Sequence, residues 1–395
     1  MKTTVAIVKG SKNPQQTEIR KMVEQSIGLI GGIDDIISRG DRVLVKPNIA
    51  YEIKPGETEV SDPRVAKAIC DILLDMGAKP LIAESSAAGV DGEAAFEASG
   101  YYDLRKQGYE VINLKAAKTK KTIILDNPRG KVLKKVKVWA LVKEVDAIVN
   151  LPVIKTHDHL PATLALKNIK GLLVDAEKKN FHHKYGLSQA IADLNLVIKP
   201  DLTIVDGIFC REGLGYPFSD EIEMDLIIAG KDPVAVDTVT LLIMDIDPLK
   251  QEHAVLAEEH GIGTMDMKKI DVVGKKISDV KRKFKRPEEA LKKMLNLNDF
   301  EILASDTTCT GCRGMMFYFL KSMSDQGKLS DLKKYTFIVG MHDSLPKGLD
   351  KEKTILVGVC LEQYKGLGRY VKGCPPFGSD VASAVFGKDV KQPYE

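Results

Sequence analysis

Short runs of β-branched and other apolar residues alternate with amphipathic stretches along the first part of the chain. This alternation is typical of a mostly parallel sheet that is covered by helices. Helices are expected between several of the apolar runs, for example over Pro63–Met76 and Leu187–Val197. Strands are expected at TVAIVKG, RVLVKPNI, KPLIAESS, EVINL, DAIVNLPVI, LTIVDGI and DLIIAG. The pattern therefore predicts an α/β fold with a mostly parallel, layered sheet.

The composition changes near Val273, where a stretch rich in charged residues begins. We predict an α/β core domain over residues 1–273, a charged helical linker over 274–303, and a smaller C-terminal, cysteine-rich, cluster-binding region over 304–395. The basic cluster at 281–286 has no interleaved aromatic residues. It is therefore interpreted as part of a solvated linker and not as a nucleic-acid site.

The overall charge is nearly balanced, with 58 basic and 55 acidic side chains and a formal net charge of +3. Nothing global therefore attracts the protein to nucleic acid or to an anionic membrane. The first ten residues hold too short an apolar run for a signal peptide, and no later stretch reaches the length of a membrane span. We expect a cytoplasmic protein without nucleic-acid or membrane partners.

Six cysteines occur in the chain, and four of them lie close to its C-terminus. In a reducing compartment, closely spaced cysteines indicate a metal or redox site rather than disulfides. Cys70 lies on the apolar stripe of an expected helix and Cys210 ends an apolar run, so both are predicted to be buried packing residues. The remaining four are candidate metal ligands: Cys309, Cys312, Cys360 and Cys374.

The spacing of these four cysteines favours an iron–sulfur cluster. Cys309 and Cys312 form a C-x-x-C turn in TTCTGCRG, where neighbouring glycines let the backbone direct two thiolates to one centre. Cys360 ends the strand-like run TILVGVC, and Cys374 lies between a glycine and two prolines in VKGCPPFG. A Cys-Pro sequence of this kind also closes cluster-binding runs in ferredoxins.

Two other interpretations of the cysteines stay open. Four thiolates can hold a structural zinc ion, although such sites usually use two close pairs, whereas two of these cysteines are single residues on separate segments. Four unrelated thiols are the other interpretation, and the glycine-rich turns argue against it. A cluster with four protein ligands suits electron transfer or a structural role. An iron that lacks a protein ligand could instead act as a Lewis acid.

Polar residues follow several of the expected strands, and ligands of open α/β sheets bind beyond the carboxyl ends of the strands. Lys155 and His157 are candidate catalytic residues, because a lysine can bind an anion and an imidazole transfers protons near neutral pH. A solvated polar loop is the alternative reading of this segment. Lys46 and Asn48 are candidate substrate-binding residues. The polar residues that follow the expected strands are Lys46, Asn48, Glu84, Ser85, Lys155, His157 and Asp206.

Three further residues, Lys167, His182 and Glu212, join the predicted site. The segment 162–173 is expected to be helical with Lys167 towards solvent. If its amino end instead faces the cleft, its free amides favour a carboxylate or phosphate beside Lys155, and Lys167 is a candidate substrate-binding residue. His182 and Asp206 could form a catalytic base and its orienting acid, with strand capping as the alternative role of Asp206. Glu212, in a glycine-broken loop, is a candidate for substrate binding. No nucleophile elbow, Walker loop or G-x-G-x-x-G motif follows an expected strand.

Five segments carry a family resemblance, in the order VLVKPNI, TEVSDPRVAKAI, LPVIKTHDHLPATLALKNIKGLL, AIADLNLVIKPDLTIVDGI and GKDPVAVDTV. In these segments the chain resembles the uncharacterised prokaryotic family known as domain of unknown function 362. The resemblance extends from about Val43 to Ile262 and includes the cysteine-bearing C-terminal region. The resemblance implies a four-iron four-sulfur site on Cys309, Cys312, Cys360 and Cys374. The chain has one set of four cysteines, so it departs from members with a two-cluster ferredoxin insertion.

The leading hypothesis is an iron–sulfur oxidoreductase or lyase of anaerobic-type metabolism that acts on a small anionic substrate. Lys46 and Lys155 would bind the anion, Asn48 would orient it, and His157 or His182 would transfer protons. A second hypothesis is a non-catalytic electron carrier or assembly factor that docks to a redox partner protein. A third is a structural-zinc protein.

Overall fold

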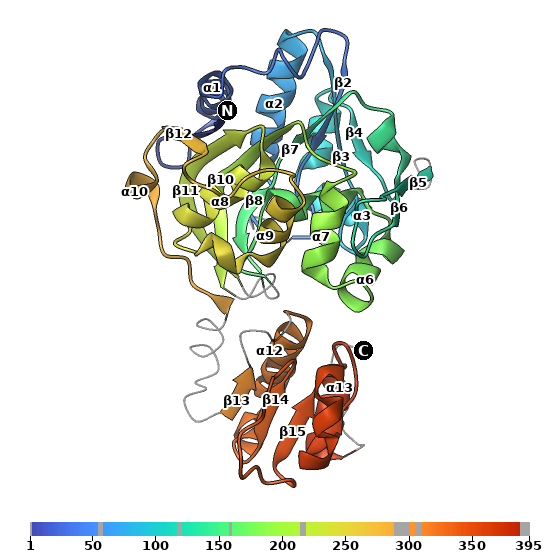
Figure 1. Ribbon diagram of the computed structural model, residues 1–395. Coiled ribbons are helices and arrows are strands. Elements are labelled where there is room, and N and C mark those ends of the chain that lie inside the picture. The colour runs from blue at the N-terminus through green and yellow to red at the C-terminus, as the bar shows by residue number, and fades with distance from the viewer. Residues whose placement is uncertain are drawn as a thin grey trace. The chain divides into compact units, whose positions relative to one another are not determined.

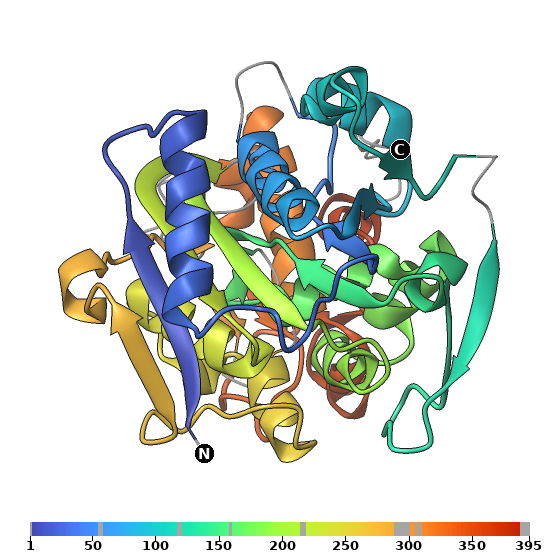
Figure 2. The same ribbon diagram turned by 90° about the horizontal axis from the view of Figure 1, so that it is seen from above.

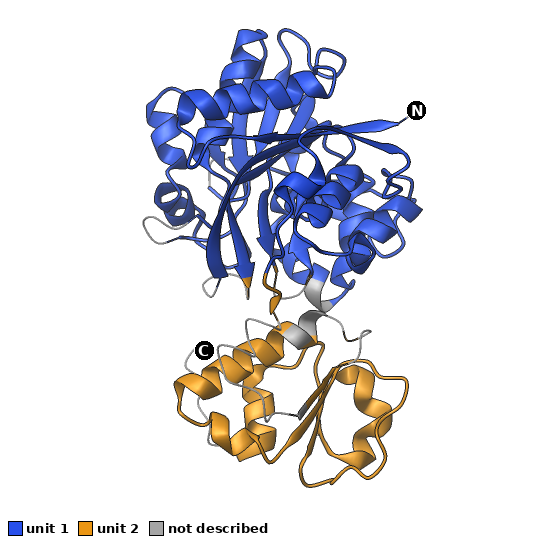
Figure 3. Cartoon of the chain, turned by 90° about the vertical axis from the view of Figure 1, so that its left-hand side faces the viewer, with its two compact units in different colours: residues 1–156, 161–212, 216–284 blue, residues 157–160, 213–215, 285–395 orange. Residues whose placement is uncertain are grey.

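The computed structural model describes residues 2–53, 58–116, 121–157, 160–213, 219–287, 301–304, 308 and 310–387. The chain divides into two compact units (Figure 3). Unit 1 consists of residues 1–156, 161–212 and 216–284, and unit 2 consists of residues 157–160, 213–215 and 285–395. Each unit is described by itself below.

Unit 1 is built on a ten-stranded sheet in which most neighbouring strands are parallel. The antiparallel pairs include β1 with β11 and β8 with β9. This architecture confirms the predicted α/β class and the mostly parallel sheet. In spatial order the main path is β12 (Ile270–Gly274), β1 (Thr3–Lys9), β11 (Ser219–Gly230), β10 (Leu202–Gly213), β7 (Ala147–Asn150), β2 (Arg42–Lys46), β3 (Lys79–Glu84) and β4 (Val111–Asn113), with β8 (Val153–Thr156) on β10 and β9 (Ala162–Thr163) on β8.

Helices cover both faces of this sheet. Side chains alternate along β1, so that Ala6 and Val8 pack into the core formed with α1 and α2, while Val5 and Ile7 pack into the core formed with α8. Figure 2 shows α1 and α2 side by side, and α9 packs on α8 (Figure 1). The helices are α1 (Gln16–Leu29), α2 (Pro63–Asp75), α3 (Gly92–Ala98), α4 (Tyr101–Lys106), α5 (Ala165–Asn168), α6 (Asp175–His183), α7 (Leu187–Asn195), α8 (Pro233–Ile243), α9 (Glu252–Glu259) and α10 (Ile277–Val280), with 3-10 turns η2 (Ala140–Lys143), η3 (Ile169–Leu172) and η4 (Pro248–Lys250).

The two helices that were expected by their bounds are present. The helix expected over Pro63–Met76 is α2, and the helix expected over Leu187–Val197 is α7. Helix α2 begins with proline at its first position, and the side chain of Asp62 accepts a hydrogen bond from Arg64 N at 2.8 Å. Proline and an aspartate cap at these positions are the usual start of a helix.

Two segments differ from the prediction. The run DAIVNLPVI forms two strands, β7 and β8, because the chain leaves the sheet path at Leu151 and Pro152, and proline cannot donate to a strand ladder. The segment 162–173 forms β9, the short helix α5 and the turn η3 instead of one helix. Helix α5 begins only at Ala165, whose N–H donates to the buried carboxylate of Asp237 at 2.7 Å.

A separate antiparallel hairpin in unit 1 joins β5 (Thr122–Asp126) to β6 (Lys135–Trp139). Unit 2 contains a four-stranded sheet in which all three neighbouring pairs are parallel. The rings of Phe319 and Phe337 pack in its core with centroids 5.9 Å apart. Its elements are β13 (Glu301–Ala304), α12 (Thr310–Asp325), η5 (Leu329–Leu332), β14 (Thr336–Val339), β15 (Thr354–Val357), η6 (Val359–Leu367), β16 (Arg369–Val371) and α13 (Gly378–Phe386). Within the described ranges, no helix combines the length and the apolar character needed to cross a membrane.

Candidate functional site

The strand order of unit 1 changes direction at β2. From β2 the chain continues to β3 and β4 on one side, and β7 later adds to the other side of β2 (Figure 1). Ligands of open α/β sheets bind at such a switch point, beyond the carboxyl ends of the strands. Lys46 and Asn150, the last residues of β2 and β7, are paired in register, and Glu84 ends β3. A buried polar side chain therefore ends each of three neighbouring strands.

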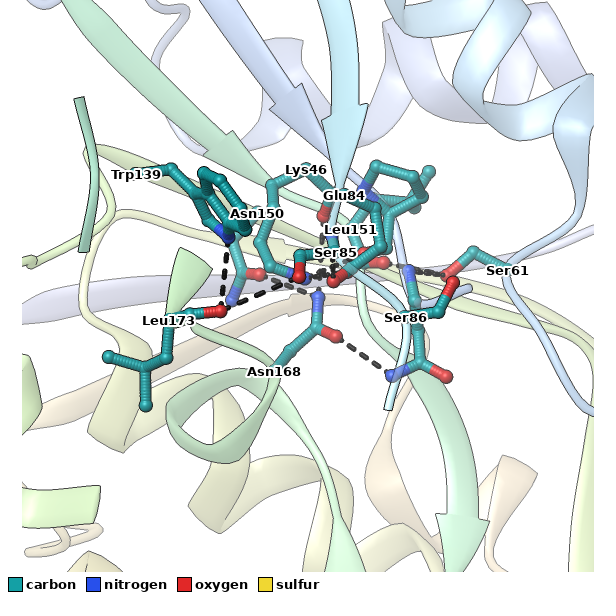
Figure 4. Close-up of polar contacts among 12 residues, drawn as sticks. Lys46, Ser61, Glu84, Ser85, Ser86, Trp139, Asn150, Leu151, Asn168 and Leu173 are labelled. Carbon is teal, nitrogen blue, oxygen red and sulfur yellow. Dashed lines mark hydrogen bonds and ion pairs between the residues drawn. The ribbon is translucent and has the colours of Figure 1, made fainter. Parts of the chain in front are cut away.

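Lys46 and Glu84 form a buried ion pair at these strand ends (Figure 4). The side chain of Lys46 is 0% exposed and that of Glu84 is 3% exposed. Lys46 Nζ also donates to Pro47 O at 2.8 Å. Burial lowers the pKa of Lys46, and the adjacent carboxylate of Glu84 opposes this shift. The ammonium of Lys46 is thus held by groups of the protein itself.

Two asparagine side chains connect Lys155 to the backbone of Lys46, and a third extends the network to the end of β7. Lys155 Nζ donates to Asn48 Oδ1 at 3.0 Å, and Asn48 Nδ2 donates to Asn168 Oδ1 at 3.0 Å. Asn168 Nδ2 donates to Asn150 Oδ1 at 2.8 Å and to Lys46 O at 3.3 Å (Figure 4). A buried network of this kind fixes its members relative to one another. The structure therefore brings three of the predicted site residues, Lys46, Asn48 and Lys155, into one network.

Lys155 and Arg211 lie next to each other on neighbouring strands, because they are register partners in β8 and β10. The buried carboxylate of Glu59 lies beside both cations, 3.5 Å from Lys155 Nζ and 3.7 Å from Arg211 Nε. Ser219 Oγ donates to Glu59 Oε2 at 2.7 Å. Burial lowers the pKa of Lys155, Glu59 opposes the shift, and Arg211 adds to it.

Lys178 of α6 holds the turn that follows β3. Its Nζ donates to Ser85 Oγ at 2.8 Å, to Ser86 O at 2.6 Å and to Ser85 O. Burial lowers the pKa of Lys178 to about 7, although the carboxylate of Glu84 acts in the opposite direction. Unlike an ordinary lysine, this one therefore exchanges its proton near neutral pH.

Asp206 binds backbone groups with both carboxylate oxygens. Its Oδ2 accepts the N–H of Asp62 at 2.6 Å, and its Oδ1 accepts the N–H of Ile208 at 3.0 Å. Burial, followed by the charge of Asp62, raises the pKa of Asp206 to about 7. The side chain of His182 lies outside the described residues, so the predicted pairing of His182 with Asp206 stays a prediction.

The other predicted residues have contacts of their own. Lys167 Nζ donates to Thr163 Oγ1 at 3.2 Å. The buried carboxylate of Glu212 is 3.3 Å from the guanidinium of Arg282. His157 directly follows β8 and is half-buried. The roles in binding and catalysis that the sequence suggested for these residues stay predictions.

Sequence reasoning did not select several residues of this polar network. Asn150 could have been found, because it ends an apolar strand in the same way as Lys46 does. Glu59 follows no strand, and its burial depends on partners distant in sequence. Lys178 lies in a helix of polar composition without a distinguishing signal. The residues not selected are Glu59, Asn150, Asn168, Lys178 and Arg211.

A hollow of about 140 Å³ lies at the opposite end of two strands of the sheet. Its lining includes Asp146 and Ala147, at the amino end of β7, and Asp201, just before β10. The carboxyl ends of parallel strands are the usual ligand-binding edge. This hollow therefore does not coincide with the polar network.

In unit 2, three of the predicted metal ligands follow the carboxyl ends of parallel strands. Cys312 lies in the first turn of α12, after β13, Cys360 lies at the start of η6, after β15, and Cys374 follows β16. The N–H of Val359 donates to Gly373 O at 3.0 Å, and these two residues directly precede Cys360 and Cys374. Cys360 is therefore not the last residue of a buried strand, and the three cysteines lie at one edge of the sheet.

Cys312 is buried against Gly358. A Cβ built on Gly358 would lie 3.1 Å from Cys312 Sγ, and Gly358 has a φ of +110°, so glycine is the residue that fits here. Cys360 is half-buried and Cys374 is exposed. The described residues contain no group of three His, Cys, Asp or Glu side chains close enough to hold a metal ion, and Cys309 lies outside them. Thiolates from separate elements at one edge suit an iron–sulfur cluster, which stays a prediction.

The other two cysteines are packing residues, as predicted. Cys70 of α2 and Cys210 of β10 are buried in the two hydrophobic cores of unit 1. Burial raises the pKa of both thiols. Both residues therefore provide controls for substitutions of the candidate ligands.

Comparisons with known proteins match the chain to a family and to proteins of similar sequence or fold. Residues 43–241 match the model of a family described as Domain of unknown function (DUF362). The "Thylakoid-associated protein sll1697" of Synechocystis sp. (strain ATCC 27184 / PCC 6803 / Kazusa) is 29% identical over 224 residues, which are 55% of this chain and 68% of that protein.

Among solved structures, the lactate racemase apoprotein from Thermoanaerobacterium thermosaccharolyticum is similar with a TM-score of 0.36 and 14% identity. The match covers 51% of this chain and 50% of that chain, so the chain spans half the length of this relative. A similarity of this size carries no argument about activity.

Proposed function

Since the chain belongs to the DUF362 family, we propose that it is an iron–sulfur protein and an enzyme that acts on a small anionic substrate. The observation that carries the proposal is the position of Cys312, Cys360 and Cys374, each of which follows a strand at the carboxyl edge of one parallel sheet. With Cys309 they would hold a four-iron four-sulfur cluster. Such a cluster, when bound, supplies or accepts an electron, or polarises a ligand where an iron lacks a protein donor.

The substrate half of the proposal rests on the polar network of unit 1. Lys155 and Lys46 are buried cations at strand ends, and Asn48 links them through Asn168. Lys155 attracts the anion, Asn48 orients it, and His157 or His182 holds the proton that is transferred. The reaction class that fits these groups is an oxidoreductase or a lyase, and the location proposed for it is the cytoplasm, where thiols stay reduced.

Anaerobic purification followed by iron and acid-labile sulfide analysis tests the cluster. About four irons and four sulfides per chain, with visible absorption that dithionite bleaches, are expected. Cys312→Ser is expected to lose iron, whereas Cys70→Ser and Cys210→Ser, in the cores of unit 1, keep it. A protein that binds zinc and no iron would refute the cluster.

The enzymatic half is tested against the electron-carrier alternative. Lys155→Ala and His157→Ala are expected to abolish the biological activity of the protein while leaving its iron content unchanged. Activity that survives both substitutions with an intact cluster would favour a carrier or assembly factor.

A further inference from the structure

Two cations face the same place on neighbouring strands of unit 1. Lys155 of β8 and Arg211 of β10 are register partners, and both side chains are buried. Like charges on paired strand positions destabilise a sheet, and burial adds to that cost. An anion must therefore lie beside them, and in this structure it is the carboxylate of Glu59.

The carboxylate of Glu59 satisfies these cations incompletely, although the backbone carbonyl of Glu59 accepts a hydrogen bond from Lys155 Nζ at 2.9 Å. Its carboxylate oxygens are 3.5 Å from Lys155 Nζ and 3.7 Å from Arg211 Nε, whereas charge-assisted hydrogen bonds are about 2.7–2.9 Å long. Arg211 Nε is buried and has no hydrogen-bond partner in the described part of the chain. A buried guanidinium donor without a partner is costly, and an anionic oxygen is the group that would relieve it.

The buried side chains at this place carry one excess positive charge. Lys155 and Arg211 contribute two positive charges, and the buried Glu59 contributes one negative charge. Glu221 lies 3.8 Å from Arg211 Nη2, but its side chain is 37% exposed, so water screens its charge. The excess matches a singly charged ligand. A planar carboxylate also fits the planar guanidinium edge of arginine.

From these contacts we infer that a small monocarboxylate is the anion that this site binds, next to the Glu59 carboxylate and against the unused donor of Arg211. One of its oxygens would accept a hydrogen bond from the unused N–H of Arg211 Nε. Its negative charge would balance the positive charge of Lys155. Asn48, whose Oδ1 accepts from Lys155 Nζ, keeps that ammonium directed to the ligand. The inference rests on the anionic-substrate part of the proposed function and names its chemical class.

Isothermal titration of the full-length, anaerobically purified protein tests the inference, with acetate as the monocarboxylate and sulfate as a dianion. Saturable binding of acetate is expected, with sulfate at least about tenfold weaker. Arg211→Gln should weaken acetate binding at least about tenfold, and Arg211→Lys, which keeps the charge but lacks the planar donors, should also weaken it. Arg20→Gln, on the surface of α1, should leave binding unchanged.

Glu59→Gln is expected to change the affinity for acetate in the opposite direction. Because it removes the competing carboxylate, it should bind acetate about tenfold more tightly than the natural protein and should gain affinity for sulfate. Acetate that fails to bind, that binds equally to the Arg211 variants, or that binds Glu59→Gln more weakly overturns the inference. Iron analysis of the same samples separates the two claims: absent binding with iron present contradicts this inference alone, and binding without iron contradicts the cluster alone.

Discussion

The carboxylate of Glu84 packs directly against the backbone of Gly171, so closely that a Cβ built on Gly171 would overlap it. Gly171 lies in the turn η3, and Glu84 is the residue that pairs with the fully buried ammonium of Lys46. The absence of a side chain at position 171 therefore leaves room for the central ion pair of the polar network.

Gly171→Ala is expected to destabilise the protein by about 2 kcal/mol, because the added methyl group overpacks a buried site and displaces the Glu84 carboxylate. Urea unfolding measures the effect. Gly28→Ala, in α1, is the matched control, since no atom lies within 4 Å of the added Cβ. An equal effect of the two substitutions would contradict the role given to Gly171.

Removal of one partner of the Lys46–Glu84 pair is expected to cost about 3–5 kcal/mol, because it leaves the other charge buried and uncompensated. Lys46→Met and Glu84→Gln each test this in denaturant unfolding. The double variant should lose less than the sum of the two single losses, since neither charge is then left alone. Additive losses would show that the two side chains do not interact.

The burial of Lys178 makes stability depend on pH. The pKa of Lys178 is about 7 in the folded protein, and it is about 10.4 in an unfolded chain. Between these pH values the unfolded chain binds more protons, so the free energy of unfolding due to this group rises as pH increases.

Lys178→Met removes that contribution. The difference in the free energy of unfolding between the natural protein and this variant should therefore shift in favour of the natural protein from about pH 7 to pH 10. Lys12→Met is the control, because the Lys12 side chain is 84% exposed and its removal should leave the pH profile unchanged. A flat difference for Lys178→Met would contradict the lowered pKa.

A substitution at Gly358 tests the position of Cys312 at the carboxyl edge of the unit 2 sheet. Gly358→Ala would place a methyl group 3.1 Å from Cys312 Sγ and should reduce bound iron per chain in the anaerobically purified protein. Gly348→Ala is the matched control, because Gly348 also has a positive φ but no atom lies within 4 Å of the added Cβ. Both should lose about 1 kcal/mol of stability from backbone strain. Equal iron contents in the two variants would contradict the placement of Cys312.

The sequence predicted the strands of unit 1 best where the chain has a strong local signal. RVLVK and KPLIAE are apolar runs that end in Lys46 and Glu84, and Asp62 and Pro63 mark the start of α2. The break between β7 and β8 was not predicted: Pro152 is its local signal, but the pairing of β8 with β10 depends on residues distant in sequence.

The polar network was predicted only in part for a similar reason. Lys46, Asn48 and Lys155 directly follow strands or lie within them, where polar residues are conspicuous. Glu59 is placed by Lys155 and Arg211, whose strands lie far along the sequence, so no local pattern indicates its burial. In unit 2 the strands have three or four residues, too few for periodicity to predict a four-stranded sheet.

X-ray absorption at the iron and zinc edges of the anaerobically purified, full-length protein tests the central claim most directly, namely that Cys309, Cys312, Cys360 and Cys374 hold one iron–sulfur centre. The account predicts iron with sulfur neighbours and with iron–iron scattering, both lost in Cys312→Ser. Zinc bound to sulfur without iron, or iron without sulfur neighbours, would contradict it.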